Sequence, residues 1–225
     1  MQRAFDILFS LLGLLFLSPL LLPVATILRI TGEGEVFYRQ ERVGRGGRRF
    51  KLIKFATMLK NSPLLGTGTV TVKDDPRILP FGHFLRKTKI NELPQLLNIL
   101  LNDMSVVGPR PQAPRCFDAF PPNVRETILQ MKPGLSGIGP IVFRDEENLL
   151  ANQTGSVEFY DQTIAPYKGR VEAWYRDHQT MFVYFTVIAI TAWVVIFPRS
   201  QIVWRVFPDL PAPPAELATA LGYPS

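Results

Sequence analysis

The residues best suited to chemistry lie in the segment 85–101, where polar and charged side chains precede an apolar helix pattern. The apolar positions recur every three or four residues, as on one face of a helix: Leu93, Leu96, Leu97, Leu100 and Leu101. Asn91 suits the N-cap of this helix, which places Glu92 in its first turn. Free N–H groups and the positive end of the helix dipole favour phosphate binding there, within reach of Arg86 and Lys87. A capped core helix without a ligand is the alternative for this segment taken alone.

A second candidate for phosphate binding is the run Gly108-Pro109-Arg110-Pro111. The two prolines restrict the backbone around Arg110, so this arginine loses little freedom on binding a ligand. Arginine is also the side chain suited to two-pronged contact with phosphate. Arg77 is a further and weaker phosphate candidate.

Basic residues are concentrated between positions 39 and 60, in a chain of net charge +6. This block contains one acid, Glu41, and eight basic residues: Arg39, Arg42, Arg45, Arg48, Arg49, Lys51, Lys54 and Lys60. Such a block suits an anionic partner, namely lipid headgroups, phosphates or nucleic acid, and a solvated basic face is the alternative. Within the block we assign Lys54 to phosphate or substrate binding.

The residues 7–28 form an uncharged apolar run of 22 residues. As a straight helix they would span roughly 33 Å, about one hydrocarbon thickness. Ser18-Pro19 predicts a bend, and the Ser hydroxyl can satisfy a carbonyl that the proline leaves free. A kinked spanning helix and a re-entrant helix both fit, and length alone favours spanning. A signal peptide fits less well, because the run is long and no small-residue cleavage site follows closely.

Two further segments are marked by composition. The residues 181–197 carry no charge and are rich in aromatics, which suits an interfacial helix, with a buried core helix as the alternative. The chain from Pro208 onward is rich in Pro and Ala, which predicts a poorly ordered tail.

The soluble middle begins with a predicted β-hairpin. The residues 36–38 and 50–55 read as strands, and Gly44, Gly46 and Gly47 supply the turn between them. The residues 69–73 alternate like a third strand. The single Cys116 cannot form an internal disulfide, which favours a reducing compartment.

Taken in their order along the chain, the motifs are similar to those of the bacterial sugar transferases. These are the monotopic phosphoglycosyl transferases that start glycan assembly on undecaprenyl phosphate. The matching pieces run over about residues 1–145: Ser18-Pro19 within the first apolar run, and the segments 37–44, 54–58, 75–77, 85–88, 91–96, 103–111 and 132–134. Each piece is unspecific alone, whereas the ordered combination is specific.

The resemblance implies an α+β, mainly helical fold. It favours a re-entrant membrane helix broken at Ser18-Pro19 over a helix that spans the membrane. It also implies a small cytoplasmic domain built of helices and a β-hairpin, together with interfacial amphipathic helices. The implied division is a membrane helix at 1–32, a catalytic domain at 33–180, an apolar membrane-associated segment at 181–207 and a tail at 208–225. The implied location is the cytoplasmic face of a bacterial inner membrane.

The resemblance also implies Mg²⁺ and an Asp-Glu pair. In such enzymes the Asp attacks the β-phosphate of a nucleotide sugar, with UDP as the expected nucleotide, and polyprenyl phosphate then attacks the phosphosugar-enzyme. Carried over to this chain, Asn91 and Glu92 are the catalytic and metal-binding pair, and Arg86 and Arg110 hold phosphates. The implied partners are a nucleotide sugar, polyprenyl phosphate and membrane lipid; a homo-oligomer stays open.

Two positions depart from the pattern of the family. Asn91 stands where the nucleophilic Asp is expected, and Ala56 replaces an Arg. An amide is a poor nucleophile and a weaker Mg²⁺ ligand than a carboxylate. Three explanations are open: a natural branch that acts through Glu92 or by direct transfer between substrates, a deliberately inactivated variant, or a natural pseudoenzyme.

Two other functions compete with transfer. A membrane-bound protein that binds lipid or nucleotide sugar without turnover would also explain Asn91. Nucleic-acid binding fits the basic block, but the uncharged 22-residue run argues against it and no recognition motif is present.

Overall fold

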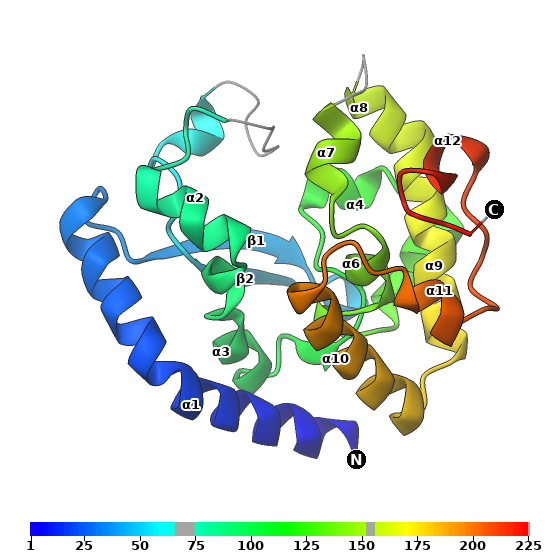
Figure 1. Ribbon diagram of the computed structural model, residues 1–225, viewed down its shortest axis with the longest axis horizontal. Helices are drawn as coiled ribbons and strands as arrows, with labels where there is room; N and C mark the ends of the chain where they lie inside the picture. Colours follow the sequence, from blue (N-terminus) through cyan, green and yellow to red (C-terminus); the bar gives the residue numbers. More distant parts are fainter. Residues whose placement is uncertain (66–74, 152–155, 225) are drawn as a thin grey trace. The chain divides into compact units, whose positions relative to one another are not determined.

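A computed structural model describes residues 1–65, 75–151 and 156–224 and is mostly helical (Figure 1). The helices are α1 (Gln2–Thr31), α2 (Pro80–Lys87), α3 (Gln95–Leu100), α4 (Pro114–Asp118), α5 (Pro122–Leu129), α6 (Ile138–Val142), α7 (Glu146–Ala151), α8 (Ser156–Phe159), α9 (Ala165–Asp177), α10 (Met181–Ile196), α11 (Ile202–Val206) and α12 (Ala215–Ala218). The strands are β1 (Phe37–Val43), β2 (Arg49–Phe55), β3 (Ser105–Val107) and β4 (Gly134–Ser136). The mainly helical prediction is confirmed, and the predicted strand at 69–73 lies outside the described residues.

The chain forms two compact units. The first contains residues 1–41 and 51–102, and the second contains residues 42–50 and 103–225. The first unit holds α1, α2, α3 and most of the hairpin. The second holds the tip of the hairpin, the β3–β4 pair and the helices from α4 onward.

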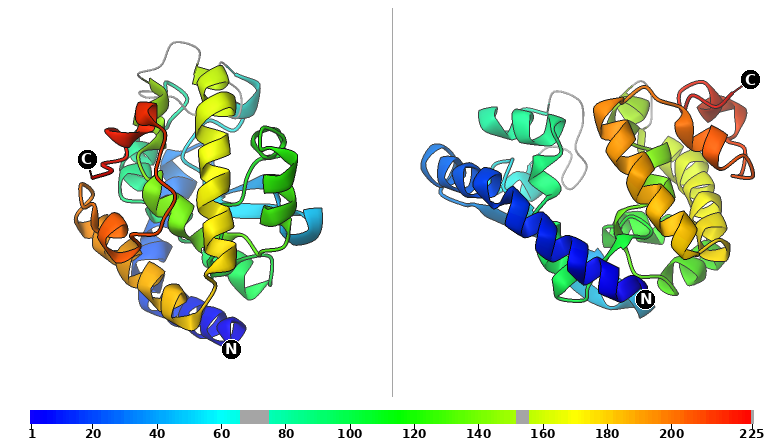
Figure 2. Two further views of the ribbon diagram at one scale, coloured as in Figure 1. Left: turned by 90° about the vertical axis from the view of Figure 1, so that its right-hand side faces the viewer. Right: turned by 60° about the horizontal axis from the view of Figure 1, so that its bottom comes forward.

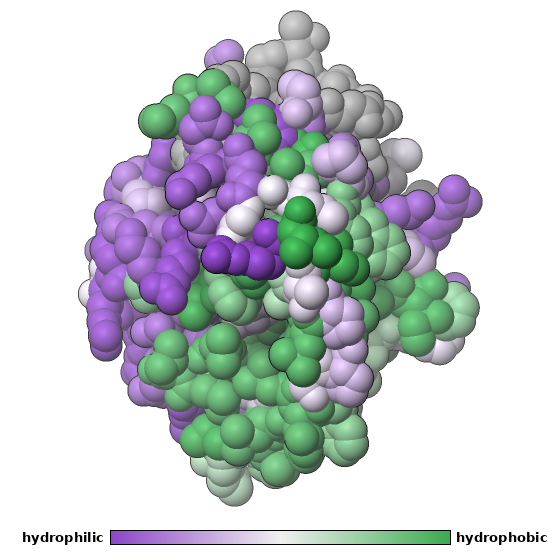
Figure 3. Space-filling view, turned by 90° about the vertical axis from the view of Figure 1, so that its left-hand side faces the viewer, coloured by the Kyte–Doolittle hydropathy of each residue, from purple (hydrophilic) through white to green (hydrophobic). Residues whose placement is uncertain are grey.

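The helix α1 is 30 residues long and has the length and apolar composition to cross a membrane. Only 11% of its most apolar 18-residue stretch is buried, so its hydrophobic side chains are largely exposed. Figure 3 shows the molecule from the side on which α1 lies, and hydrophobic side chains gather in the lower part of this view. Exposed apolar surfaces of this kind mark sites of contact with another protein or with a membrane.

Pro19 and Pro23 lie inside α1, and the helix continues past both. Pro19 has no N–H to donate to Leu15 O four residues earlier. The Ser18 hydroxyl donates to that carbonyl instead, at 2.7 Å, as the sequence predicted. Figure 1 shows α1 bending along its length, which confirms the expected bend.

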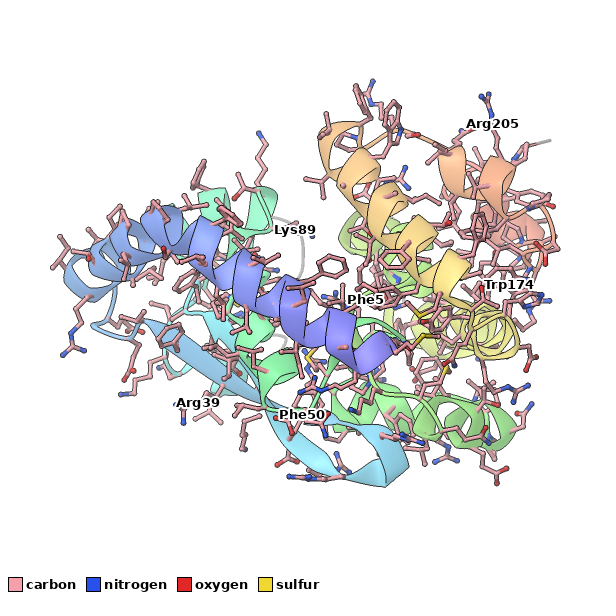
Figure 4. All side chains as sticks on the ribbon, turned by 90° about the horizontal axis from the view of Figure 1, so that it is seen from below. Phe5, Arg39, Phe50, Lys89, Trp174 and Arg205 are labelled. Atoms are coloured by element: carbon pink, nitrogen blue, oxygen red, sulfur yellow. The ribbon has the colours of Figure 1, made fainter. Side chains whose placement is uncertain are left out.

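The predicted hairpin is present as β1 and β2, which pair with each other. A short 3-10 turn, Arg45–Gly47, joins them, and Gly46 and Gly47 have φ values of 65° and 80°. Such values are unfavourable for other residues, so glycine is needed here. The first strand is longer than predicted and reaches Val43. Arg39 on β1 projects from the hairpin into solvent (Figure 4).

In the second unit, β3 pairs with β4 in parallel, with Ser105 opposite Gly134 and Val107 opposite Ser136. The helix α9 is the long helix that crosses this unit in the left view of Figure 2. It packs against α5 and α6. Its buried side chains include Val171 and Tyr175, so α9 forms much of the core of the unit.

The apolar run at 181–197 forms α10, which packs on α6, β3 and β4. Val187 and Ile190 are buried on one face, as in a core helix. Phe182, Trp193 and Ile196 are exposed, so the rest of the helix surface is also hydrophobic. The helix therefore combines a buried core face with an uncovered apolar surface.

The prediction of a poorly ordered tail was wrong. Leu210, Leu217 and Leu221 are buried, and the Tyr167 hydroxyl donates to Pro211 O at 2.8 Å. Composition suggested disorder because Pro and Ala dominate, but apolar residues at intervals give the tail a face to bury. The tail therefore packs as part of the second unit.

Candidate active site

The structure brings Lys54 and Glu92 together in the first unit. Lys54 comes from β2, and Glu92 ends the 3-10 turn Ile90–Glu92. The Lys54 Nζ lies 3.7 Å from Glu92 Oε1, and the two side chains are only 16% and 17% exposed. Partial burial weakens solvent screening, so this pair interacts more strongly than a surface ion pair. A predicted carboxylate and a predicted phosphate-binding lysine thus share one place.

Asn91 does not cap a helix, contrary to the prediction. It lies within the 3-10 turn, while α3 begins four residues later with Pro94 at its N-cap. Pro94 lacks an N–H and so cannot extend a helical ladder back toward Asn91. The N-cap assignment of Asn91 is therefore wrong, and phosphate binding near this turn stays a prediction.

The side chain of Asn91 is nevertheless unusual. Asn91 is 5% exposed, and its Oδ1 atom is buried without a hydrogen-bond partner. A buried acceptor without a donor costs roughly 1–3 kcal/mol. Lys89, two residues earlier, has a left-handed backbone with φ 60°, which non-glycine residues rarely adopt. Strain and an unsatisfied oxygen in one turn point to a ligand-binding role.

Asn98 fixes α3 against β2, a role that the sequence pattern did not reveal. Its side-chain oxygen accepts the Ile53 N–H at 2.9 Å, and its NH₂ group donates to Lys51 O at 2.9 Å. The next two residues of α3 accept hydrogen bonds from Arg3 of α1, at Ile99 O (2.5 Å) and at Leu100 O (3.0 Å). These contacts hold the segment that follows Glu92. A polar Asn among leucines was the available signal.

The predicted leucine face of α3 is only partly correct. Leu96 is buried, and Ile99 and Asn98 share the buried side with it. Leu97 is 37% exposed and Leu101 is 66% exposed. The helix is turned so that Asn98 meets the edge of β2, which leaves these two leucines outside the core. The apolar spacing therefore predicted the helix but not which of its sides is buried.

Arg86 lies half-buried in the last turn of α2. This helix is held by Leu85, which is buried in one cluster with Phe55, Val24 and Leu28. The turn that carries Asn91 and Glu92 follows directly and contacts α2. Arg86 is therefore anchored near the turn by a packed helix.

Arg77 is engaged within the fold. Its guanidinium donates to Asp75 at 2.5 and 2.8 Å, and to Ser62 O at 2.9 Å and Leu65 O at 2.8 Å. The carboxylate of Asp75 raises the pKa of Arg77 further above its ordinary value. These contacts account for Arg77 as a structural residue that ties the segment before α2 to the residues after β2.

Arg110 belongs to the second unit, in the loop that follows β3. The Gly108 N–H donates to Ser136 O at 2.9 Å, and the Gly134 N–H donates to Pro109 O at 2.8 Å. A side chain at Gly108, Gly134 or Gly137 would overlap neighbouring backbone atoms, so the loop and β4 approach closely. Arg110 thus projects from a tightly fixed backbone.

The residues present fit a magnesium ion only with help from a substrate. Within the described ranges, no group of three or more His, Cys, Asp and Glu side chains could hold a metal. Mg²⁺ is often held by one or two protein oxygens together with substrate phosphates. Glu92 and the unsatisfied Asn91 Oδ1 could supply two such oxygens.

A family comparison identifies the class of protein. The model of the family described as bacterial sugar transferase matches residues 1–198, which include the whole first unit, most of the second unit and every candidate residue above. The chain belongs to the bacterial sugar transferase family.

Several curated relatives are similar to this chain over more than half of its length. The exopolysaccharide production protein ExoY of Sinorhizobium fredii is 36% identical over 159 residues, covering 64% of this chain and 70% of the relative. The putative undecaprenyl-phosphate N-acetylgalactosaminyl 1-phosphate transferase of Bacillus subtilis is 41% identical, covering 53% and 66%. The UDP-glucose:undecaprenyl-phosphate glucose-1-phosphate transferase of Escherichia coli is 35% identical, covering 71% of this chain but 35% of the relative.

Proposed function

We propose that this chain transfers a sugar 1-phosphate from a UDP-sugar to undecaprenyl phosphate and so starts the assembly of a glycan. The family match over residues 1–198 carries the proposal. The names of the Bacillus subtilis and Escherichia coli relatives describe this type of transfer. The comparisons give no support to the alternative of an impaired binding protein.

The chemistry needs charge neutralisation and positioning more than covalent participation of the protein. In our proposal Lys54, Arg86 and Arg110 are each phosphate-binding residues. Glu92 acts as the catalytic carboxylate, and with Asn91 it would hold Mg²⁺. The metal, when bound, supplies positive charge to the diphosphate oxygens. The ion pair between Lys54 and Glu92 keeps the carboxylate oriented before the substrates arrive.

Asn91 changes the expected sequence of steps. An amide cannot serve as an effective nucleophile, so a phosphosugar-enzyme would not form at this position. We propose direct transfer: an oxygen of undecaprenyl phosphate attacks the sugar-bearing β-phosphorus, and a new P–O bond forms. The bond from that phosphorus to the bridging oxygen breaks, and this oxygen leaves with the nucleoside monophosphate. The products are the lipid diphosphate sugar and the nucleoside monophosphate.

Direct transfer predicts that the chain forms no phosphosugar adduct when it is mixed with the UDP-sugar alone. Intact-protein mass spectrometry should show the unmodified mass. The Asn91→Asp variant should show a mass increased by the phosphosugar, because it regains a carboxylate in the same buried turn. An adduct on the unsubstituted chain would rule out direct transfer while leaving the overall reaction intact.

We propose a re-entrant course for α1, so that both of its ends lie on the cytoplasmic face of the inner membrane. The exposed apolar side chains of α1, its bend and the Ser18 hydrogen bond to Leu15 support this proposal. The exposed apolar surface of α10 and the basic hairpin would lie at the lipid interface, where apolar and cationic groups are both favoured.

The re-entrant course predicts labelling of both ends of α1 from the same side. Cys116 is the single cysteine, so a Cys116→Ser background can carry Gln2→Cys at the start of α1 or Arg45→Cys in the exposed hairpin turn. An impermeant maleimide should label both variants in inverted vesicles and neither in intact spheroplasts. If the Gln2→Cys variant were labelled in intact spheroplasts and not in inverted vesicles, α1 would span the membrane.

The proposed activity is tested by extraction of a lipid product. Membranes containing the chain, undecaprenyl phosphate and each of a panel of radiolabelled UDP-sugars should yield labelled lipid for at least one sugar. Binding of the UDP-sugar without labelled lipid for any donor would favour the non-enzymatic alternative.

A further inference from the structure

A buried carboxylate lies behind the Arg110 loop in the second unit. Glu172 on α9 is 4% exposed and accepts a hydrogen bond from the backbone N–H of Arg110. Its Oε2 atom is buried and has no hydrogen-bond partner. Burial raises the pKa of Glu172 to about 7, against the opposing effects of Lys168 and of the Arg110 N–H. Burying an acidic side chain is costly unless it is paired and fully hydrogen-bonded, and Glu172 is only partly so.

The surroundings leave room for this carboxylate and little else. A side chain at Gly139 in α6 would overlap Glu172 Oε1, so the glycine makes space for the acid. Lys168, one turn earlier on α9, is itself bound to Glu146 at 2.6 and 2.7 Å. Its charge therefore only partly offsets the burial of Glu172.

The same helix also contacts the chain before the loop. Tyr175 is one turn after Glu172, and its hydroxyl lies 3.5 Å from Val107 O at the end of β3. The side of α9 that carries Glu172 and Tyr175 thus contacts the chain on both sides of Gly108 and Pro109.

We propose that Glu172 is a positioning residue, which holds the backbone of Arg110 so that its guanidinium is presented to the diphosphate of the nucleotide sugar. The assignment of Arg110 to phosphate rests on the proposed function, whereas the hold on the backbone does not. Arg110 lies between Pro109 and Pro111, which carry no N–H. Its amide is therefore the one backbone donor of the 109–111 segment.

Hydrogen exchange tests the hold on the backbone without any need for turnover. Because of the flanking prolines, exchange in the 109–111 segment reports the Arg110 amide alone. Glu172→Met removes the acceptor at similar size, and it should speed this exchange at least about tenfold, in line with the loss of one buried hydrogen bond. Glu172→Gln keeps an acceptor oxygen and should restore most of the protection. Unchanged exchange in Glu172→Met would overturn the proposal.

Kinetics in two backgrounds test the link to the substrate. Glu172→Met should lower kcat/KM for the UDP-sugar about tenfold, mainly through KM, and Glu172→Gln should recover most of it. In an Arg110→Ala background the same change should cost less than about twofold, because the side chain being positioned is gone. An equal loss in both backgrounds would contradict positioning through Arg110.

Trp174→Phe is the matched control on α9. The Trp174 Nε1–H donates to Asp209 at 2.9 Å, away from the Arg110 loop. This variant should leave both the Arg110 exchange and kcat/KM unchanged. A loss equal to that of Glu172→Met would show that any disturbance of α9 has the same effect, and would overturn the specific role of Glu172. If no donor supports turnover in any form of the chain, the proposed function fails while the exchange result still decides the positioning.

Discussion

Glu92→Gln is expected to lower transfer to undecaprenyl phosphate by about 10²- to 10⁴-fold, the range typical for loss of a positioned acid or base. The substitution keeps the size of the side chain and removes its charge. It thereby removes the ion pair with Lys54 and the one carboxylate of the buried 3-10 turn. The rate should be measured as labelled lipid formed per folded protein at saturating donor.

The matched control is Glu35→Gln, which removes the same charge from an exposed ion pair with Lys60 at 2.8 Å in the same unit. Surface pairs of this kind contribute little, so transfer should stay close to that of the unsubstituted chain. If Glu92→Gln kept half or more of the activity, Glu92 would have no place in the mechanism.

The second large effect is expected on stability rather than on catalysis. Arg77→Met should lower the free energy of unfolding by about 3 kcal/mol, because it removes the guanidinium that neutralises the buried Asp75 carboxylate and donates to two backbone carbonyls. Urea titration in detergent, followed by tryptophan fluorescence, would measure the change. At temperatures where the variant is folded, its KM for the donor should be unchanged.

Replacing both partners separates a structural pair from a phosphate ligand. Arg77→Met combined with Asp75→Leu should recover part of the lost stability, since the buried negative charge is removed together with its guanidinium partner. Arg115→Met, in an exposed pair with Asp161 at 3.1 Å, should change stability little. A KM raised tenfold in stable Arg77→Met protein would return Arg77 to the list of phosphate-binding residues.

The sequence predicted the elements that depend on local patterns. The hairpin follows from strand-forming residues around glycines, and the Ser18 hydrogen bond follows from the carbonyl that Pro19 leaves free. The long apolar helix follows from an uncharged run. These features depend on residues close together in the chain, which is why a single sequence can show them.

Features that depend on distant contacts were missed. Asn91 was assigned to an N-cap because spacing cannot show that Pro94 starts the helix. Asn98 is fixed by β2, more than 40 residues earlier, and the hydrogen bond of Glu172 reaches Arg110, about 60 residues away. For Asn98, a polar residue within an apolar pattern was the available signal. The burial of Glu172 became visible only in the folded structure.

Release of nucleoside monophosphate from a UDP-sugar, with and without undecaprenyl phosphate, tests the central claim most directly. The account predicts release when both substrates are present, in equal amount to the lipid-linked product, and none above background when the lipid phosphate is omitted. If no UDP-sugar gave nucleoside monophosphate in the presence of undecaprenyl phosphate, although both substrates bound, the chain would not be the transferase proposed.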